Sequence, residues 1–282
     1  SASALHFDFA YTQFAYCAPS RNSFLSGRRP DRTRALNFLS TFRDAVGGKS
    51  WTTMPEYFKK HGYFTSSAGK IFHDGMDDPI SWTYPSNQTK WISCQKGDII
   101  DHLTHERHGG GNFCGVTNES ALQYTDEDLA LFEGLMRMRL ANASGKPWWV
   151  SIGIHRPHTK YRTPEGFYGF QLYPANASGG DPVKPPLHPQ APQNVPYMSG
   201  NWEGGDINDP AHGCPDCIIP NVRAVEYRRW YYAAVTWADH SLGRALNELE
   251  MMGDAVSSNT ITVFHSDHGE CVCVCVCVCV CV

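Results

Sequence analysis

The sequence lacks the features that mark several classes of protein. No stretch of it approaches the roughly 18 to 20 uncharged apolar residues that a membrane-spanning helix needs. It has no dense run of lysine and arginine, and its formal net charge is -4, so a general surface for nucleic acid or another polyanion is not indicated. An anionic substrate would therefore have to be bound locally, by a few residues. The start at Ser1 also lacks a charged segment followed by an apolar core, so we expect an internal or processed start.

Cysteine is sparse over most of the chain. Five of the eleven cysteines are scattered before residue 271, namely Cys17, Cys94, Cys114, Cys214 and Cys217. The others alternate with valine from Cys271 to Val282, which is the direct translation of a repeated TG dinucleotide, because TGT encodes cysteine and GTG encodes valine. We interpret residues 271–282 as a gene-model artefact, a read-through into an intron, in preference to a thiol-rich metal-binding tail.

Four Asn-x-Ser/Thr sequons in polar or glycine-rich stretches indicate the secretory pathway, and hence a lysosomal or extracellular protein. The four asparagines are Asn87, Asn118, Asn142 and Asn176. This compartment permits disulfides, and Cys94 with Cys114, which flank a glycine-rich loop, is the candidate pair. Cys214 and Cys217 have the spacing of half a zinc site, but no second pair is suitably placed, so a local disulfide or free thiols are favoured.

Hydrophobic periodicity predicts helices that alternate with strands. Thr53-Met-Pro-Glu56 is typical of a capping box with proline in the first turn, so a helix is expected from there to about Lys60. Two longer helices are expected, one from about Thr125 and one over about 222–252. The first of them should bury an apolar face made of Leu129, Phe132, Leu135 and Met136. Strands are expected at 63–67, 148–154 and 260–264.

This alternation predicts an α/β fold, in which a largely parallel, mixed sheet lies between layers of helices. The apolar content of 41% over 282 residues is ample for such a core. Residues 173–220 are rich in proline, glycine, asparagine and histidine, which predicts a long irregular segment of the kind that shapes a substrate pocket. Ligands of such sheets bind at the carboxyl ends of strands, where His155 and Asp267 are both expected.

The most specific motif surrounds Cys17. The segment Cys17-Ala-Pro-Ser-Arg21 is followed by Leu25-Ser-Gly-Arg-Arg-Pro30. Pro19 suits the start of a short helix and Gly27 its end, so Cys17 would lie at the positive end of that helix, where free backbone N–H groups attract an anion. The competing interpretation is an ordinary buried cysteine beside a surface arginine.

This motif resembles the signature of the sulfatase family, and other segments extend the resemblance from about residue 10 to residue 269. Gly69-Lys70-Ile-Phe-His73 is similar to a segment in which the lysine and the histidine contact the sulfate and the nucleophile. Gly153-Ile-His155-Arg-Pro-His158 is similar to a segment whose first histidine protonates the leaving oxygen or binds the sulfate. Ser266-Asp267-His268-Gly269 is similar to a segment that supplies calcium ligands. The last two segments favour the iduronate-2-sulfatase branch of the family.

The resemblance implies an alkaline-phosphatase-like fold and a hydrolase that removes sulfate from a sulfated sugar, as in glycosaminoglycan degradation. Its nucleophile would be formylglycine, made from Cys17 by a formylglycine-generating enzyme. Lys70 and Arg21 would offset anionic charge, and His155 would supply the leaving-group proton. The implied catalytic residues are Cys17, Arg21, Lys70, His73 and His155, with Lys70 and His155 also on the substrate. Ca²⁺ would be bound by residue 17, Asp267 and His268.

The sequence departs from the family pattern at both ends. Family members begin with a strand that ends in an Asp-Asp pair, which residues 1–16 lack, and a lysine and a Gly-Glu-His-Gly-like stretch are missing after Asp267. Because Ca²⁺ takes six to eight mostly oxygen ligands, Asp267 and His268 leave its shell incomplete. We therefore expect residues 1–270 to form part of an N-terminal catalytic domain with little or no activity. The alternatives are another sulfate or phosphate ester hydrolase of the same superfamily, a non-catalytic binder of sulfated glycans, and a truncated product without a function.

Overall fold

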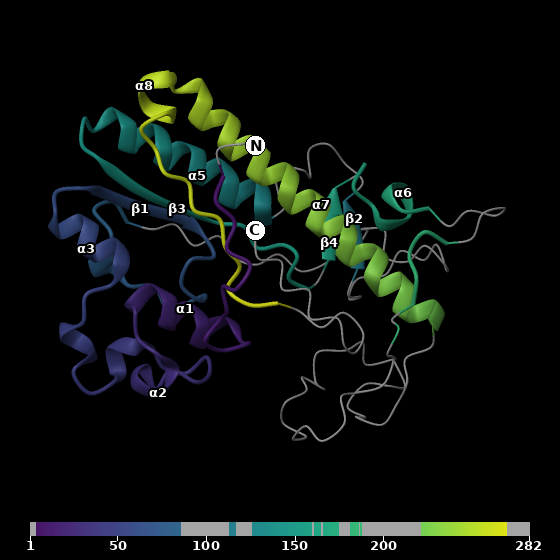
Figure 1. Ribbon diagram of the computed structural model, residues 1–282, viewed down its shortest axis with the longest axis horizontal. Coiled ribbons are helices and arrows are strands. Elements are labelled where there is room, and N and C mark those ends of the chain that lie inside the picture. The colour runs from purple at the N-terminus through teal and green to yellow at the C-terminus, as the bar shows by residue number, and fades with distance from the viewer. Residues whose placement is uncertain are drawn as a thin grey trace.

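The computed structural model describes residues 4–85, 113–116, 126–159, 161–164, 166–174, 181–185, 187 and 221–269 (Figure 1). The helices are α1 (Cys17–Ser26), α2 (Pro30–Thr33), α3 (Met54–Lys60), α5 (Asp126–Ala143), α6 (Gly169–Leu172), α7 (Asn221–Met251) and α8 (Asp254–Ser257). The strands are β1 (Phe64–Gly69), β2 (Phe113–Val116), β3 (Trp148–Gly153) and β4 (Tyr161–Pro164). Short 3₁₀ turns cover Phe42–Asp44, Gly48–Ser50 and Pro79–Ser81.

All strand pairs in the described part of the chain are parallel. β1 pairs with β3 in a register that runs from Phe64 opposite Trp148 to Gly69 opposite Gly153. β2 pairs with β4, with Phe113 opposite Tyr161. Figure 1 shows α5, α7 and α8 on one side of β1 and β3, and α1, α2 and α3 on the other. The predicted α/β architecture, with a parallel sheet between helices, is confirmed.

Helix α3 forms where its capping box predicts it. The Thr53 side chain accepts a hydrogen bond from the Glu56 backbone N–H, and the Glu56 carboxylate accepts one from the Thr53 N–H, both at 3.2 Å. These two bonds satisfy donors that the first turn of a helix leaves free. The other predicted helices, α5 and α7, and the strands β1 and β3 also form within one or two residues of their expected bounds.

The prediction for the apolar face of α5 holds only in part, since Leu129 and Leu135 are half-buried but Phe132 and Met136 are not. Phe132 and Met136 are 63% and 46% exposed, whereas Ala130, Leu131 and Met138 are buried. The cause is the close approach of α5 to the sheet, because a Cβ on Gly134 would overlap the Ile152 side chain of β3. Small residues therefore face the strands at this contact, and the larger Phe132 and Met136 lie on the outer side.

The predicted strand at 260–264 is also wrong. This segment is extended but belongs to no strand among the described residues, and Ile261 and Val263 are 90% and 74% exposed. A strand needs a hydrogen-bonded neighbour in register. The segment beside it in Figure 1 is the irregular chain before α1, which offers no such ladder.

Several predictions lie outside the described residues. These are the sequons at Asn87, Asn118 and Asn176, the Cys94–Cys114 pair, the pair Cys214 and Cys217, and the Cys-Val tail. Asn142 is described, and it is exposed near the end of α5. Within the described ranges, no helix is both long and apolar enough to cross a bilayer.

Candidate active site

Cys17 is the first residue of α1, as its motif predicts. Tyr16 precedes the helix in an extended conformation, and Gly27 ends it with a positive φ of 63°. The glycine suits this left-handed position because it has no Cβ. Cys17 is only 5% exposed, so its thiol lies at the N-terminal end of the helix and away from bulk water.

Lys70 and His155 follow the carboxyl ends of the paired strands β1 and β3. The Lys70 N–H continues the ladder by donating to the Gly153 carbonyl at 3.1 Å. This close pairing directs the buried Lys70 side chain toward α1, where its Nζ donates to Cys17 Sγ at 3.6 Å. His155 thus follows the carboxyl end of a strand as predicted, whereas Asp267 follows an extended segment that belongs to no strand among the described residues.

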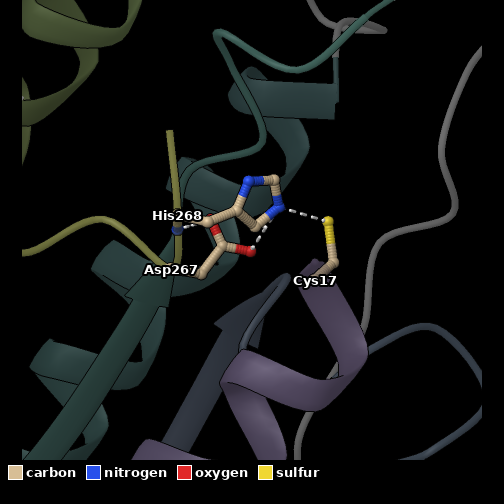
Figure 2. Close-up of side chains that lie close together, drawn as sticks. All are labelled: Cys17, Asp267 and His268. Atoms are coloured by element: carbon tan, nitrogen blue, oxygen red, sulfur yellow. Dashed lines mark hydrogen bonds and ion pairs between the residues drawn. The ribbon is translucent and has the colours of Figure 1, made fainter. Parts of the chain in front are cut away.

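The segment that contains Asp267 and His268 reaches the same thiol from the far end of the sequence (Figure 2). His268 Nε2 lies 3.0 Å from Cys17 Sγ, although the two residues are 251 positions apart. Arg21 Nε donates to Asp267 Oδ2 at 2.9 Å. The hydroxyls of Thr12 and Ser20 donate to the Asp267 carbonyl at 2.8 and 2.5 Å. Four side chains from α1 and the segment before it thus fix Asp267 and His268 against the helix start.

His158 is a further contact of Cys17 that we did not predict. Its imidazole is hydrogen-bonded to Cys17, its Nδ1 bonds to the Thr159 carbonyl, and its ring lies edge-on to His155 at 4.9 Å. The sequence did offer a signal for this contact. His155-Arg-Pro-His158 contains two histidines three residues apart, a spacing that brings both rings together. Thr12 and Ser20 gave no comparable signal, since hydroxyl residues are common in loops and helix starts.

His73 lies at the margin of this group. Its ring stacks on Phe38 at 4.3 Å, and burial together with the Lys70 charge lowers its pKa. The structure therefore brings Cys17, Arg21, Lys70, Asp267 and His268 into direct contact. It places His155 beside them through His158, and it leaves His73 within reach of the Lys70 charge.

The surroundings of Cys17 favour its thiolate. Burial alone would raise the pKa of the thiol, but hydrogen bonds with His158 and His268 and the charge of Lys70 outweigh burial and lower the pKa to about 6. Thiolates are stabilised in the same way beside histidine and lysine in other proteins. At pH 7 residue 17 is therefore largely a thiolate.

The partners of Cys17 are shifted in complementary directions. Burial would lower the pKa of His268, but its bond to Cys17 and the charge of Asp267 raise that pKa to about 9. Burial would raise the pKa of Asp267, but Arg21, His268 and Lys70 hold it below its ordinary value. Burial and the charges of Lys70 and Arg156 lower the pKa of His155 well below its ordinary value. The site thus holds charged His268 and Asp267 beside a neutral His155.

Cys17, Asp267 and His268 could together hold a metal ion, since one ligand atom from each lies within 4.8 Å of the others. In the described ranges no other group of three such side chains meets this criterion. The set offers one sulfur, one nitrogen and one carboxylate, whereas Ca²⁺ takes six to eight oxygens. Oxidation of Cys17 to an oxygen-bearing group would improve the match, but it would still leave most of the shell unfilled.

The chain has the alkaline-phosphatase-like fold, in which a parallel sheet lies between helices, and the start of α1, a lysine and histidines gather at one edge of this sheet. The phosphonate monoester hydrolase of Agrobacterium radiobacter shares this fold with a TM-score of 0.57 and 16% identity, over 92% of this chain and 54% of that one. The sulfatase family model matches residues 1–273, and the chain belongs to the sulfatase family.

Curated relatives include the iduronate 2-sulfatases of Mus musculus and Homo sapiens. They are 33% and 32% identical over 93% and 94% of this chain, and the match covers 48% of each relative. The chain thus spans about half the length of these relatives. The family and fold predicted from the motifs are confirmed.

Proposed function

We propose that this chain carries the nucleophile and charged groups of a sulfuric-ester hydrolase that removes sulfate from a sulfated sugar. The observation that carries the proposal is the convergence of Lys70, His158 and His268 on the sulfur of Cys17. The similarity to iduronate 2-sulfatases supports a sulfated iduronate residue of a glycosaminoglycan as the substrate.

In this proposal residue 17 acts after oxidation to formylglycine by a formylglycine-generating enzyme. The side chain –CH₂SH becomes –CHO in a two-electron oxidation by molecular oxygen, in which one oxygen atom enters and the sulfur leaves as H₂S. Water adds to the aldehyde, and one hydroxyl of the hydrate attacks the substrate sulfur while the sugar oxygen leaves with a proton. Loss of a proton from the second hydroxyl then re-forms the aldehyde and releases sulfate.

The surrounding residues have distinct roles in this scheme. Lys70 supplies a buried positive charge 3.6 Å from the nucleophilic position, where it would offset charge on the transferring sulfate. His158 contacts the nucleophile and would accept its proton, while the charged His268 beside it would offset negative charge at the same position. His155 would protonate the leaving oxygen, and an anionic ester beside it would counter the Lys70 charge that lowers its pKa. Arg21 acts through Asp267, which it holds in place.

Mass spectrometry of residue 17 tests this proposal. The chain, co-expressed with a formylglycine-generating enzyme, is expected to show the aldehyde in the peptide that contains residue 17. The peptides of Cys94, Cys114, Cys214 and Cys217 serve as internal controls and should lack it. An unmodified thiol at residue 17 under these conditions would contradict the proposed nucleophile.

We propose further that the chain as given turns over substrate slowly or not at all. Ca²⁺ would supply electrostatic stabilisation of the transferring sulfate, but the donor set of Cys17, Asp267 and His268 does not complete its shell. Sulfate release from a sulfated iduronate glycoside is the measurement, with a phosphonate monoester alongside because one such hydrolase shares the fold. Turnover of either ester at a normal enzymatic rate would contradict the expectation.

The same proposal places the protein in the secretory pathway, in the lysosome or outside the cell. The exposed position of Asn142 near the end of α5 supports it, since a glycan there would project into solvent.

We propose that residues 1–270 form part of one catalytic domain and that residues 271–282 are not native structure. A spliced transcript that continues into the Cys-Val repeat would contradict the second statement.

A further inference from the structure

A second group of positive charges lies at the opposite end of α1 from Cys17. Arg28, Arg32 and Arg34 line a cavity of about 440 Å³ together with Asp31, Val46 and Trp51. At about 1.5 Å per residue, the ten residues of α1 separate this cavity from the nucleophile by roughly 15 Å. None of the residues assigned to the catalytic site lines it.

The arginines of this cavity have no neutralising partner in the described ranges. Asp31 is the one carboxylate in the lining, and it is paired with Nε of Arg29, a residue outside the lining, at 3.2 Å. Arg32 and Arg34 form no ion pair with any residue that the structure describes, and all three lining arginines are exposed. Three guanidinium groups that share a cavity with a single carboxylate, itself paired with Arg29, favour an anionic ligand. Their planar forks match oxyanions in two-point contacts.

The backbone at Arg34 is held in a conformation that suits glycine. Arg34 has a φ of 57° and ends α2, and among the described residues it is the one non-glycine residue with a positive φ. For a residue with a Cβ this conformation is strained. A glycine would make the same turn without strain but would remove one guanidinium from the cavity.

The rest of the lining is apolar, which distinguishes the cavity from a simple anion site. The half-buried indole of Trp51 lies under Arg28, whose guanidinium carbon is 5.5 Å from the ring centroid. Val46 is almost fully exposed at the rim. Sugar rings present C–H faces to aromatic and aliphatic side chains, while their sulfate groups bind guanidinium.

We propose that this cavity is a binding site for a sulfated sugar unit of a glycosaminoglycan, separate from the catalytic centre. Arg28, Arg32 and Arg34 bind the sulfate, and Trp51 and Val46 contact the sugar ring. The choice of a sulfated glycan over an inorganic anion rests on the proposed function, whereas the preference for an anion rests on the cavity alone. The chain as a whole has a net charge of -4, so this cluster of positive charge stands against a negative background.

Calorimetric binding of a heparin-derived oligosaccharide tests the site, with Arg32→Gln as the variant and Lys49→Gln as its control. Both side chains are exposed cations, but only Arg32 lines the cavity. We expect Arg32→Gln to weaken binding by roughly tenfold, because a charged hydrogen bond is lost, and Lys49→Gln to leave it unchanged. Circular dichroism confirms that both variants fold.

Equal affinities of Arg32→Gln and the unaltered chain, or an equal loss in Lys49→Gln, would overturn the site. Inorganic sulfate and the chemically desulfated oligosaccharide separate the two parts of the ligand. If inorganic sulfate alone matches the oligosaccharide in affinity and in sensitivity to Arg32→Gln, the sugar contact is overturned. None of these measurements needs turnover, so a thiol at residue 17 together with weakened binding in Arg32→Gln would reject the proposed function and support the cavity.

Discussion

Arg21 shows how a single side chain organises the site. Its motif predicts that it offsets substrate charge, but in the folded chain two of its three guanidinium nitrogens already bind other parts of the protein. Nε bonds Asp267, and Nη1 bonds the backbone carbonyls of Lys70 and Ile71. Arg21 therefore joins α1 to both the loop after β1 and the segment of His268. The residue type follows from the sequence, whereas its partners depend on how distant segments meet.

Replacing Arg21 by glutamine is expected to lower the free energy of unfolding at pH 7 by roughly 2 kcal/mol, because Asp267 loses a charged hydrogen-bond partner. Asp267 has a folded-state pKa below its ordinary value. The stabilisation is thus fully present above the unfolded-state pKa of about 3.9 and is lost as the pH falls through the lower folded-state pKa. Urea unfolding at pH 7 and near pH 2 measures the difference.

The exposed pair of Arg29 and Asp31 is the control for this change. Its side chains are 75% and 62% exposed, against 11% and 16% for Arg21 and Asp267. Solvent screens such a pair, so Arg29→Gln should cost less than about 0.5 kcal/mol. Similar losses in the two variants would show that Arg21 contributes no more than a surface charge.

At the scale of elements, local signals predicted more than periodicity did. The capping box of α3 involves neighbours in sequence, and it forms as expected. The buried face of α5 depends on how closely Gly134 packs against Ile152 of β3. The spacing of Phe132 and Met136 in the sequence does not reveal this contact. Likewise the apolar alternation at 260–264 is typical of a strand but does not supply a partner for it.

The glycines at the ends of β1 and β3 are the element-scale feature on which the site depends. A Cβ on Gly153 would overlap the Lys70 backbone, whereas a Cβ on Gly27, at the end of α1, would meet nothing within 4 Å. Gly153→Ala is expected to destabilise the chain by about 3 kcal/mol through overpacking. Gly27→Ala should cost only about 1 kcal/mol, from its positive φ.

Thermal unfolding compares these two glycine variants. Gly153→Ala should also raise the pKa of Cys17, because it moves Lys70 away from the thiol, while Gly27→Ala should leave that pKa unchanged. If the two variants are equally stable, the backbones of Gly153 and Lys70 are not in close contact.

At the scale of the whole molecule, the motifs predicted the members of the site better than their arrangement. Cys17, Lys70, Asp267 and His268 come from segments far apart in the sequence, and each was identified from its own local pattern. Their mutual contacts follow from parallel pairing of β1 with β3 and from the chain before α1 lying beside the chain that leads to Asp267 (Figure 1). The role of His158 required that arrangement, because its partner is neither adjacent in sequence nor on the same element.

The pKa of Cys17 reports this assembly directly, because Lys70, His158 and His268 all come from distant parts of the sequence. The thiolate absorbance of the chain, minus that of the Cys17→Ser variant, gives the titration of this one thiol among the eleven cysteines. Half-titration near pH 6 is the expected result. A value close to 9, the ordinary value for cysteine, would mean that these side chains do not surround residue 17, and the nucleophile would have to be sought elsewhere.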